Sequence, residues 1–239
     1  MAQIQLGPIV LSSYAFFALC GAFACLIYGL FCIPKAQREQ SAYLLCYAGI
    51  GALVGAKLLY ILVSLPEISA HMDQWIYYVS SGFVFYGGLL GAIIGSVFYC
   101  HESHKDFYGQ TNVLVPMIPL FHAFARIGCF FSGCCYGAES EFLGLPTFSV
   151  YANPMEPNRI PVQLIEAGME FLLFLFLQFY KENRLYAYLV FYSIGRFLLE
   201  FWRGDPQRGI WILSTSQWIS IGIWFFLSLR FIQSYHHTK

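Results

Sequence analysis

The chain has 239 residues, and its 13 basic and 13 acidic side chains give a formal net charge of zero. Only 11% of the residues are charged and 58% are hydrophobic, whereas ordinary soluble domains carry about 25% charged residues. A neutral chain of this kind has no basic patch for nucleic acid and too few polar residues to cover a soluble globule. The composition therefore predicts an integral membrane protein.

About seven stretches are apolar and long enough to cross a bilayer as helices, which takes about 20 residues each. They cover approximately 9–33, 41–65, 78–100, 112–133, 162–180, 185–202 and 213–234. Short polar links separate them, except for a longer segment at about 138–161. The sequence therefore predicts an all-α, polytopic fold in which residues 1–239 form a single membrane domain.

The basic residues in the links are unevenly distributed, which predicts the orientation because cytoplasmic links carry the excess of Lys and Arg. Alternate links and the C-terminal segment hold Lys35, Arg38, Lys105, Lys181, Arg184, Arg230 and Lys239. The opposite set holds Arg159, Arg203 and Arg208. We expect the N-terminus outside and the C-terminus in the cytoplasm, and no cleaved signal peptide, because no basic segment precedes the first apolar stretch.

Several charges lie inside the predicted spans, where they are costly and usually face a cavity or a partner. Glu200 follows Arg196 by one helical turn, so the two can pair. Arg126 has no acid within one turn on its own helix, and its planar guanidinium suits a phosphate or carboxylate. Simple ion pairing between helices is the alternative, above all for Lys57 and Glu170. Two intramembrane arginines predict one site for an anionic lipid headgroup.

Two further stretches add to this site. In FYGGLLGAIIG (85–95), Gly91 and Gly95 are expected to pack helices closely. Gly87 and Gly88, beside Tyr86, are expected to interrupt the helix and to line a cavity. In RIPVQLIE (159–166), Pro161 is typical of a helix start. Gln163 and Glu166 in the first turns could also be explained by helix initiation and by interaction with the helix dipole.

These elements resemble, in type and in order, those of the prolipoprotein diacylglyceryl transferase family, and the resemblance covers nearly the whole chain. LSSYAFFAL places Tyr14 at the family's early tyrosine, and GALVGAKLLY keeps Tyr60 while Lys57 replaces an arginine. Three further stretches match family motifs: FYGGLLG matches FHGGLIG, ARIGCFFSGCCYGA (125–138) matches GRIGNFINGELYGR, and IPVQLIE matches HPSQLYE. The family's Tyr-x-x-x-Arg run, which ends in Glu-x-x-Arg, is matched by Tyr192, Arg196, Glu200 and Arg203. Its closing Gly-Gln-x-x-Ser element is matched in SQWIS by Gln217 and Ser220.

The departures from the family pattern fall on polar side chains. Tyr86 stands where the family has histidine, Cys129 where it has asparagine, and Cys134 where it has glutamate. Ser132 and Ala138 also differ from the signature. The arginines expected to bind an anion are retained, whereas groups that would orient substrate or move protons are replaced.

The resemblance implies a bacterial inner-membrane, multi-pass enzyme without a cofactor. In the family, the cysteine thiol of a lipoprotein precursor attacks the glyceryl carbon of phosphatidylglycerol, and glycerol phosphate leaves. The expected catalytic residues are Arg126, Arg196, Tyr86 and Cys129, the last because it lies three residues after Arg126 on the same helix face. The expected substrate-binding residues are Tyr14, Gly87, Gly88, Ser132, Gly137, Tyr192, Glu200 and Arg203. A phenol loses its proton only well above neutral pH, so Tyr86 is expected to share a site with Arg126 and to donate a hydrogen bond there, not to act as a base.

The cysteines allow another interpretation. Cys20, Cys25, Cys32, Cys46 and Cys100 are expected to pack as small apolar residues. Cys129, Cys134 and Cys135 lie near the outer end of the fourth span, where a break at Ser132-Gly133 is expected. They could pack, form a disulfide or do thiol chemistry; their spacing fits no common zinc motif, so no metal is expected. The alternatives to the transferase are a paralogue with thiol or redox chemistry and a non-catalytic lipid-binding relative.

Overall fold

The computed structural model describes residues 3–6, 9–80, 82–142, 144, 157–204, 209–210 and 212–237. The chain divides into two units, and each is described by itself. Unit 1 comprises Met1–Phe31 and Val115–Lys239, and unit 2 comprises Cys32–Leu114. Arg208, Lys239 and part of the long link expected at 138–161 lie outside the described residues.

Unit 1 begins with an antiparallel hairpin and continues as a series of helices. Strands β1 (Gln3–Leu6) and β2 (Ile9–Ser12) pair from Gln3 with Ser12 to Leu6 with Ile9. The helices are α1 (Ser13–Phe31), α6 (Met117–Ser132), α7 (Val162–Phe179), α8 (Arg184–Leu199) and α9 (Thr215–His237). After α8 come the short helix η3 (Glu200–Trp202) and the two-residue strands β3 (Gly209–Ile210) and β4 (Leu213–Ser214).

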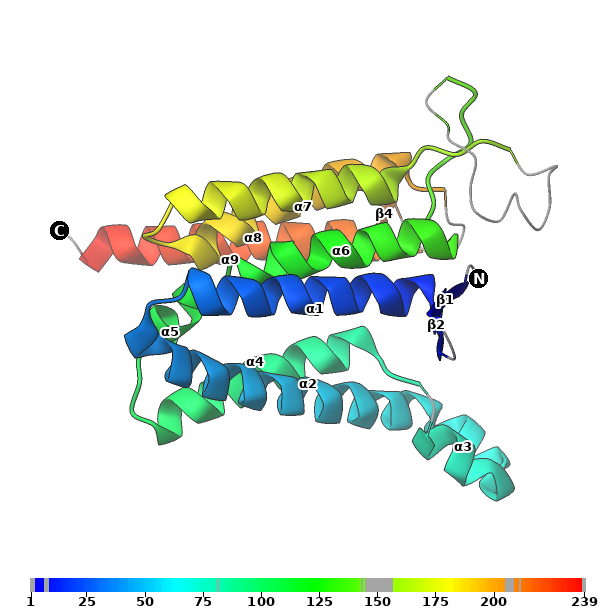
Figure 1. Ribbon diagram of the computed structural model, residues 1–239, viewed down its shortest axis with the longest axis horizontal. Coiled ribbons are helices and arrows are strands. Elements are labelled where there is room, and N and C mark those ends of the chain that lie inside the picture. The colour runs from blue at the N-terminus through cyan, green and yellow to red at the C-terminus, as the bar shows by residue number, and fades with distance from the viewer. Residues whose placement is uncertain are drawn as a thin grey trace. The chain divides into compact units, whose positions relative to one another are not determined.

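The helices of unit 1 pack in the order α1, α6, α7, α8, α9, each against the next. Figure 1 shows α1, α6 and α7 side by side, with the β1–β2 hairpin and the last turn of α9 at opposite ends of the unit. The buried cluster Val115, Leu173, Leu177 and Tyr188 joins the entry to α6 with α7 and α8. Among the residues of α1, three of 19 are buried, whereas seven of 16 in α6 and seven of 18 in α7 are buried, so the interior of the unit is centred on α6 and α7.

Unit 2 contains α2 (Lys35–Ala70), η1 (Met72–Gln74), α3 (Trp75–Ser80), α4 (Phe85–Glu102) and α5 (Phe107–Leu114). Glycines allow α2 and α4 to touch through their backbones. A Cβ atom at Gly51 would collide with the carbonyl of Gly91, and one at Gly55 with the carbonyl of Gly87. Such contacts between small residues bring membrane helices close together.

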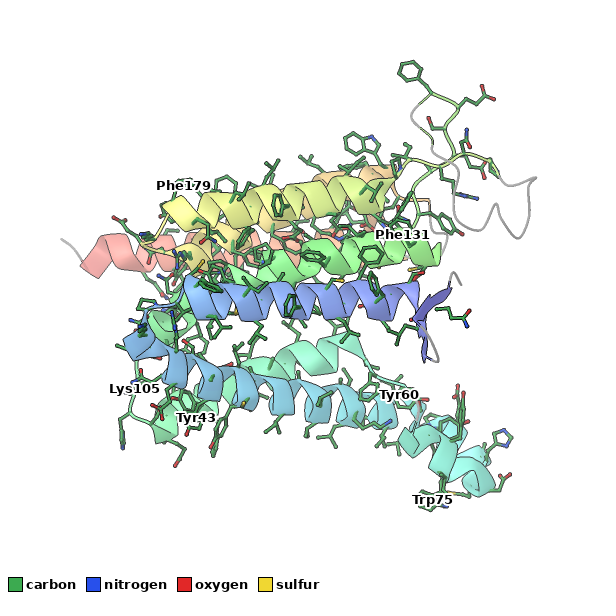
Figure 2. The ribbon with its side chains drawn as sticks, in the orientation of Figure 1. Tyr43, Tyr60, Trp75, Lys105, Phe131 and Phe179 are labelled. Carbon is green, nitrogen blue, oxygen red and sulfur yellow. The ribbon has the colours of Figure 1, made fainter. Side chains whose placement is uncertain are left out.

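The apolar character of these helices agrees with the predicted class. By length and composition, α1, α2 and α7 could each cross a membrane, and a fourth span is possible if α5 and α6 count together. Large apolar side chains project outward, among them Phe179, which is 86% exposed at the end of α7 (Figure 2). The all-α, membrane-type fold is confirmed, whereas the count of seven spans stays a prediction, because the described residues hold three candidate spans, or up to four if α5 and α6 count as one.

Two boundaries differ from the expectation. The stretch expected at 112–133 is divided into α5 and α6, because Pro116 follows Val115 and has no amide hydrogen to continue the ladder. The stretch expected from residue 78 begins only at Phe85, after a turn in which Gly82 has a φ of 71°. The predicted break at Ser132-Gly133 is confirmed: α6 ends at Ser132, and Gly133 takes a φ of 69°.

Candidate active site on α6, α7 and α8

Facing polar residues on α6 and α7 form the centre of the site. His122 and Arg126 lie one turn apart on α6, and Glu166 and Glu170 lie one turn apart on α7, so each pair shares a helix face. Nδ1 of His122 is 2.6 Å from a carboxylate oxygen of Glu170. The Nε–H of Arg126 donates to Nε2 of His122 at 3.1 Å and also lies 3.0 Å from Oε2 of Glu166.

Helix α8 brings a second arginine to the same carboxylate. Nε of Arg196 is 3.9 Å from Oε1 of Glu166, so Glu166 lies between Arg126 and Arg196. Nη2 of Arg196 is 2.6 Å from Oε2 of Glu200, which confirms the pairing predicted from their spacing. The same Nη2 group donates to the hydroxyl of Ser216 at 2.9 Å, so α9 helps to hold this guanidinium.

The charged groups of this network are buried. The side chains of Glu166, Glu170 and Arg196 are 3%, 0% and 7% exposed. A buried ion pair contributes little net stability, because each charge loses its hydration. The two arginines and three glutamates retained at this depth therefore indicate a function that needs them, and not a need for stability alone.

Both arginines still have donors to offer. Within the described residues, Nη1 of Arg196 is buried and has no hydrogen-bond partner. The interactions of Arg126 in the same described region use its Nε atom, which leaves the fork of its two Nη groups for a ligand. A buried guanidinium nitrogen without a partner is costly, and oxygens of a phosphate could satisfy it in the bidentate manner that arginine favours.

The segment after α6 is joined to the ends of α7 and α8. The amide of Gly137 donates to the carbonyl of Ile160, the amide of Ala138 to that of Trp202, and the amide of Gly204 to that of Tyr136. A Cβ at Gly137 would meet the carbonyl oxygens of Ile160 and Trp202. Close packing of three backbone segments therefore explains the requirement for glycine at this position. Arg203 lies next to Gly137, with which it forms an antiparallel bridge.

The three clustered cysteines lie at this junction. The Sγ atoms of Cys129, Cys134 and Cys135 are all within 4.8 Å of one another. Gln163, in the first turn of α7, donates its side-chain amide to the carbonyl of Cys134 at 2.7 Å. Hydrogen bonds from the thiols of Cys129 and Cys134, together with the nearby Arg203 cation, lower the pKa of the Cys135 thiol.

The remaining predicted residues of unit 1 surround this region. The backbone of Tyr14 packs on Gly128, where an added Cβ would be 3.2 Å from the Tyr14 Cα. The ring of Tyr192 contacts that of His122, with centroids 5.6 Å apart. Within the described residues, the Ser132 hydroxyl is buried without a hydrogen-bond partner.

The predicted residues of unit 2 show a different arrangement. Gly87 and Gly88 lie in the first turn of α4, so the expected interruption at this pair is wrong: the helix continues through it and packs against Gly55 of α2. Tyr86 is 43% exposed. Lys57 donates to the carbonyls of Tyr78 and Gly82, both at 3.3 Å, and so ties the turn before α4 to α2.

Sequence reasoning missed the acidic half of the site. From the sequence, His122 is assigned no role, and Glu166 and Glu170 are explained only as helix-start or ion-pairing residues. The readable signal was the matched spacing of two polar pairs, each four residues apart, on two apolar helices. Gln163 was likewise explained by helix initiation, whereas it holds the cysteine segment.

Comparisons with known proteins agree with the resemblance. A family model described as prolipoprotein diacylglyceryl transferase matches residues 2–232. A phosphatidylglycerol–prolipoprotein diacylglyceryl transferase of Clostridium tetani is 37% identical, covering 82% of this chain and 84% of the relative. A second transferase with this name, from Clostridium perfringens, is 33% identical, covering 73% of this chain and 71% of the relative. A transferase with this name from Bordetella parapertussis is 29% identical, covering 91% of this chain and 88% of the relative.

Proposed function

The chain belongs to the prolipoprotein diacylglyceryl transferase family, and we propose that it transfers a diacylglyceryl group from phosphatidylglycerol to the cysteine thiol of a lipoprotein precursor. Its relatives carry this activity in their names. The observation that supports it in the structure is the convergence of Arg126 and Arg196 on Glu166. Within the described residues, both guanidiniums keep N–H groups that these contacts do not use.

The arginines bind the phosphate of the lipid. Arg126 offers its Nη fork, and Arg196 offers the Nη1 group that has no hydrogen-bond partner among the described residues. Glu166 sets the distance between the two guanidiniums, while Glu200 and His122 fix their orientations. Because these donors are held in place before the reaction, they stabilise charge that develops on the leaving phosphate without reorganisation.

At the glyceryl carbon, the reaction forms one bond and breaks one. The sulfur of the precursor cysteine attacks the glyceryl carbon of the lipid, the bond from that carbon to the phosphate oxygen breaks, and glycerol phosphate leaves with the electron pair. Arg126 and Arg196 favour this departure electrostatically, because the leaving group gains negative charge. The precursor thiol must also lose its proton, since the thiolate is the nucleophile.

The proposal includes a topology, in which the chain crosses the bacterial inner membrane seven times with the N-terminus outside. The uneven distribution of basic residues supports it, and so do the opposite positions of the β1–β2 hairpin and the end of α9 in unit 1 (Figure 1). A reporter protein fused after Lys239 should be active only in the cytoplasm. Activity of an exported reporter at that position would contradict the orientation.

The activity is tested with the purified full chain in phosphatidylglycerol vesicles and a cysteine-containing precursor peptide. The peptide mass should rise by one diacylglyceryl group, and neither a serine version of the peptide nor vesicles of phosphatidylethanolamine should support the reaction. The gene should also restore growth to a bacterial strain depleted of its own transferase. Failure of both transfer and complementation would refute the proposed function and favour a non-catalytic lipid-binding role.

A further inference from the structure

The cysteine cluster has the geometry of a metal site. Its three sulfur atoms lie within 4.8 Å of one another. Three thiolates bound to one tetrahedral Zn²⁺ at about 2.3 Å would be roughly 3.8 Å apart. The observed sulfur separations therefore exceed those of a bound site by at most about 1 Å, a difference that side-chain rotations can close. The residues come from the end of α6 and the loop after it, so the sequence spacing alone resembled no zinc motif.

The backbone holds the cluster in an unusual conformation. Gly133 is left-handed, and the amide of Cys134 returns to the carbonyl of Cys129 at 3.2 Å, which closes the end of α6. Cys135 also has a positive φ, 60°, which is unfavourable for a residue with a side chain. Gln163 fixes Cys134 from α7. This arrangement brings three sulfurs together at one point, whereas a disulfide would need only two.

The surroundings provide charge balance and access. Arg203 lies close enough to Cys135, and Arg126 to Cys129 and Cys135, to interact with them electrostatically. Three thiolates carry three negative charges, so a divalent cation and two nearby arginines would more than compensate for them. Cys134 is exposed, which leaves the site open to solvent.

We propose that Cys129, Cys134 and Cys135 bind a thiophilic divalent cation of the Zn²⁺ type, and that its open fourth position binds the cysteine of the lipoprotein precursor. The inference rests on the proposed transferase function for its second half only. A metal site with three protein ligands keeps one position for water or substrate, and a thiol that coordinates such a cation is deprotonated outright. The cluster would therefore supply the activated nucleophile.

The location of the cluster supports this role. Cys129 follows Arg126 by three residues on α6, a rise of about 4.5 Å along the same helix face. A nucleophile bound at the cluster would thus lie beside the arginine that holds the phosphate. It also explains how the reaction proceeds with Tyr86 in place of a histidine base, because coordination replaces general base catalysis.

The step balances without a redox partner. The precursor thiol replaces the water on the cation and releases its proton to solvent on the exposed Cys134 side. The metal-bound sulfur attacks the glyceryl carbon with its electron pair, and the carbon–oxygen bond to phosphate breaks. The product is a thioether, which is a weaker ligand than a thiolate, so it leaves and water returns.

Cobalt provides a spectroscopic test that does not depend on activity. Metal-stripped full chain, reduced and in detergent, should bind one Co²⁺ with a thiolate-to-metal charge-transfer band. Changing a single ligand, as in Cys134→Ser or Cys135→Ser, should weaken binding by more than the roughly 10- to 100-fold typical of second-shell changes. The matched control is Cys32→Ser with Cys46→Ser, two exposed cysteines outside the cluster, which should leave the band unchanged.

Zn²⁺ protection from alkylation tests the same site in the unmodified protein, in case a variant fails to fold. Zn²⁺ should slow alkylation of Cys129, Cys134 and Cys135 and leave that of Cys32 and Cys46 unaffected. Absence of a saturable Co²⁺ band, or a band retained in the cluster variants, would overturn the inference. A disulfide found between cluster cysteines in the active enzyme would overturn it as well.

The precursor peptide separates this inference from the proposed function. Adding the peptide to the Co²⁺ form should intensify the charge-transfer band, and its serine version should not. Transfer activity should be lost on metal removal and restored by Zn²⁺. Full activity in the metal-free chain would overturn the inference and leave the transferase intact, whereas Co²⁺ binding without transfer under any metal condition would refute the transferase and the activating role together.

Discussion

Replacing Glu166 by glutamine tests whether one buried carboxylate sets the positions of both arginines. The amide keeps the size of the side chain but removes the charge between Arg126 and Arg196. The 3.0 Å contact with Arg126 is a close ion pair, whereas the 3.9 Å contact with Arg196 is at the edge of ion-pairing range. Most of the loss therefore comes from the first contact, which is worth about 1.5–3 kcal/mol.

A loss of about 2 kcal/mol in transition-state stabilisation corresponds to a roughly 30-fold lower kcat, at about 1.4 kcal/mol for each factor of ten. The KM for phosphatidylglycerol should stay constant or fall, because a negative charge that competes with the phosphate has been removed. The measurement is the peptide transfer assay at varied phosphatidylglycerol content, with thermal unfolding to verify that the variant is folded.

The matched control is Glu139→Gln. Glu139 pairs with Arg159 at 3.2 Å but is exposed, and such pairs contribute about 0–1 kcal/mol. It should leave kcat and KM unchanged. If Glu166→Gln has the kcat of the parent, or if its only effect is a raised KM, Glu166 does not position the arginines for the reaction.

Three other substitutions test separate parts of the account. Arg126→Lys should lose most transfer activity, because a point charge cannot replace the bidentate fork; an active lysine variant would show that charge alone is enough. Tyr86→Phe should lower kcat moderately through loss of a hydrogen bond, and unchanged kcat in both Tyr86→Phe and Tyr86→His would assign residue 86 to packing. Gly137→Ala should lower the free energy of unfolding by about 1–3 kcal/mol, because the added Cβ meets two carbonyls. The control Gly168→Ala has open space around the added Cβ and should not lower it. Equal effects of the two substitutions on the free energy of unfolding would refute the packing explanation.

Much of the fold could be read from hydropathy, because a helix in lipid must be apolar along its length. The positions of α1, α2, α7, α8 and α9 followed from their apolar stretches. The division of α5 from α6 was missed, since a break at Val115-Pro116 does not change the hydropathy of the region. The continuity of α4 through Gly87 and Gly88 was also missed, because glycine spacing alone cannot distinguish close helix packing from an interruption.

The site was predictable where partners share one helix and not where they lie on different helices. Arg196 and Glu200 are one turn apart, so their contact followed from spacing. Glu166 is 40 residues from Arg126 along the chain, and only the packing of α6 on α7 reveals the pair. The convergence of the cysteine sulfurs was equally hidden, because it depends on the left-handed turn at Gly133.

The most direct test of the central claim is a structure of the full chain with phosphatidylglycerol bound, determined in a lipid environment. The account predicts that the lipid phosphate lies within hydrogen-bonding distance of an Nη group of Arg126 and of Nη1 of Arg196, with Glu166 still between the two guanidiniums. A phosphate bound elsewhere, with Arg126 and Arg196 paired only to protein carboxylates while the enzyme is active, would contradict it.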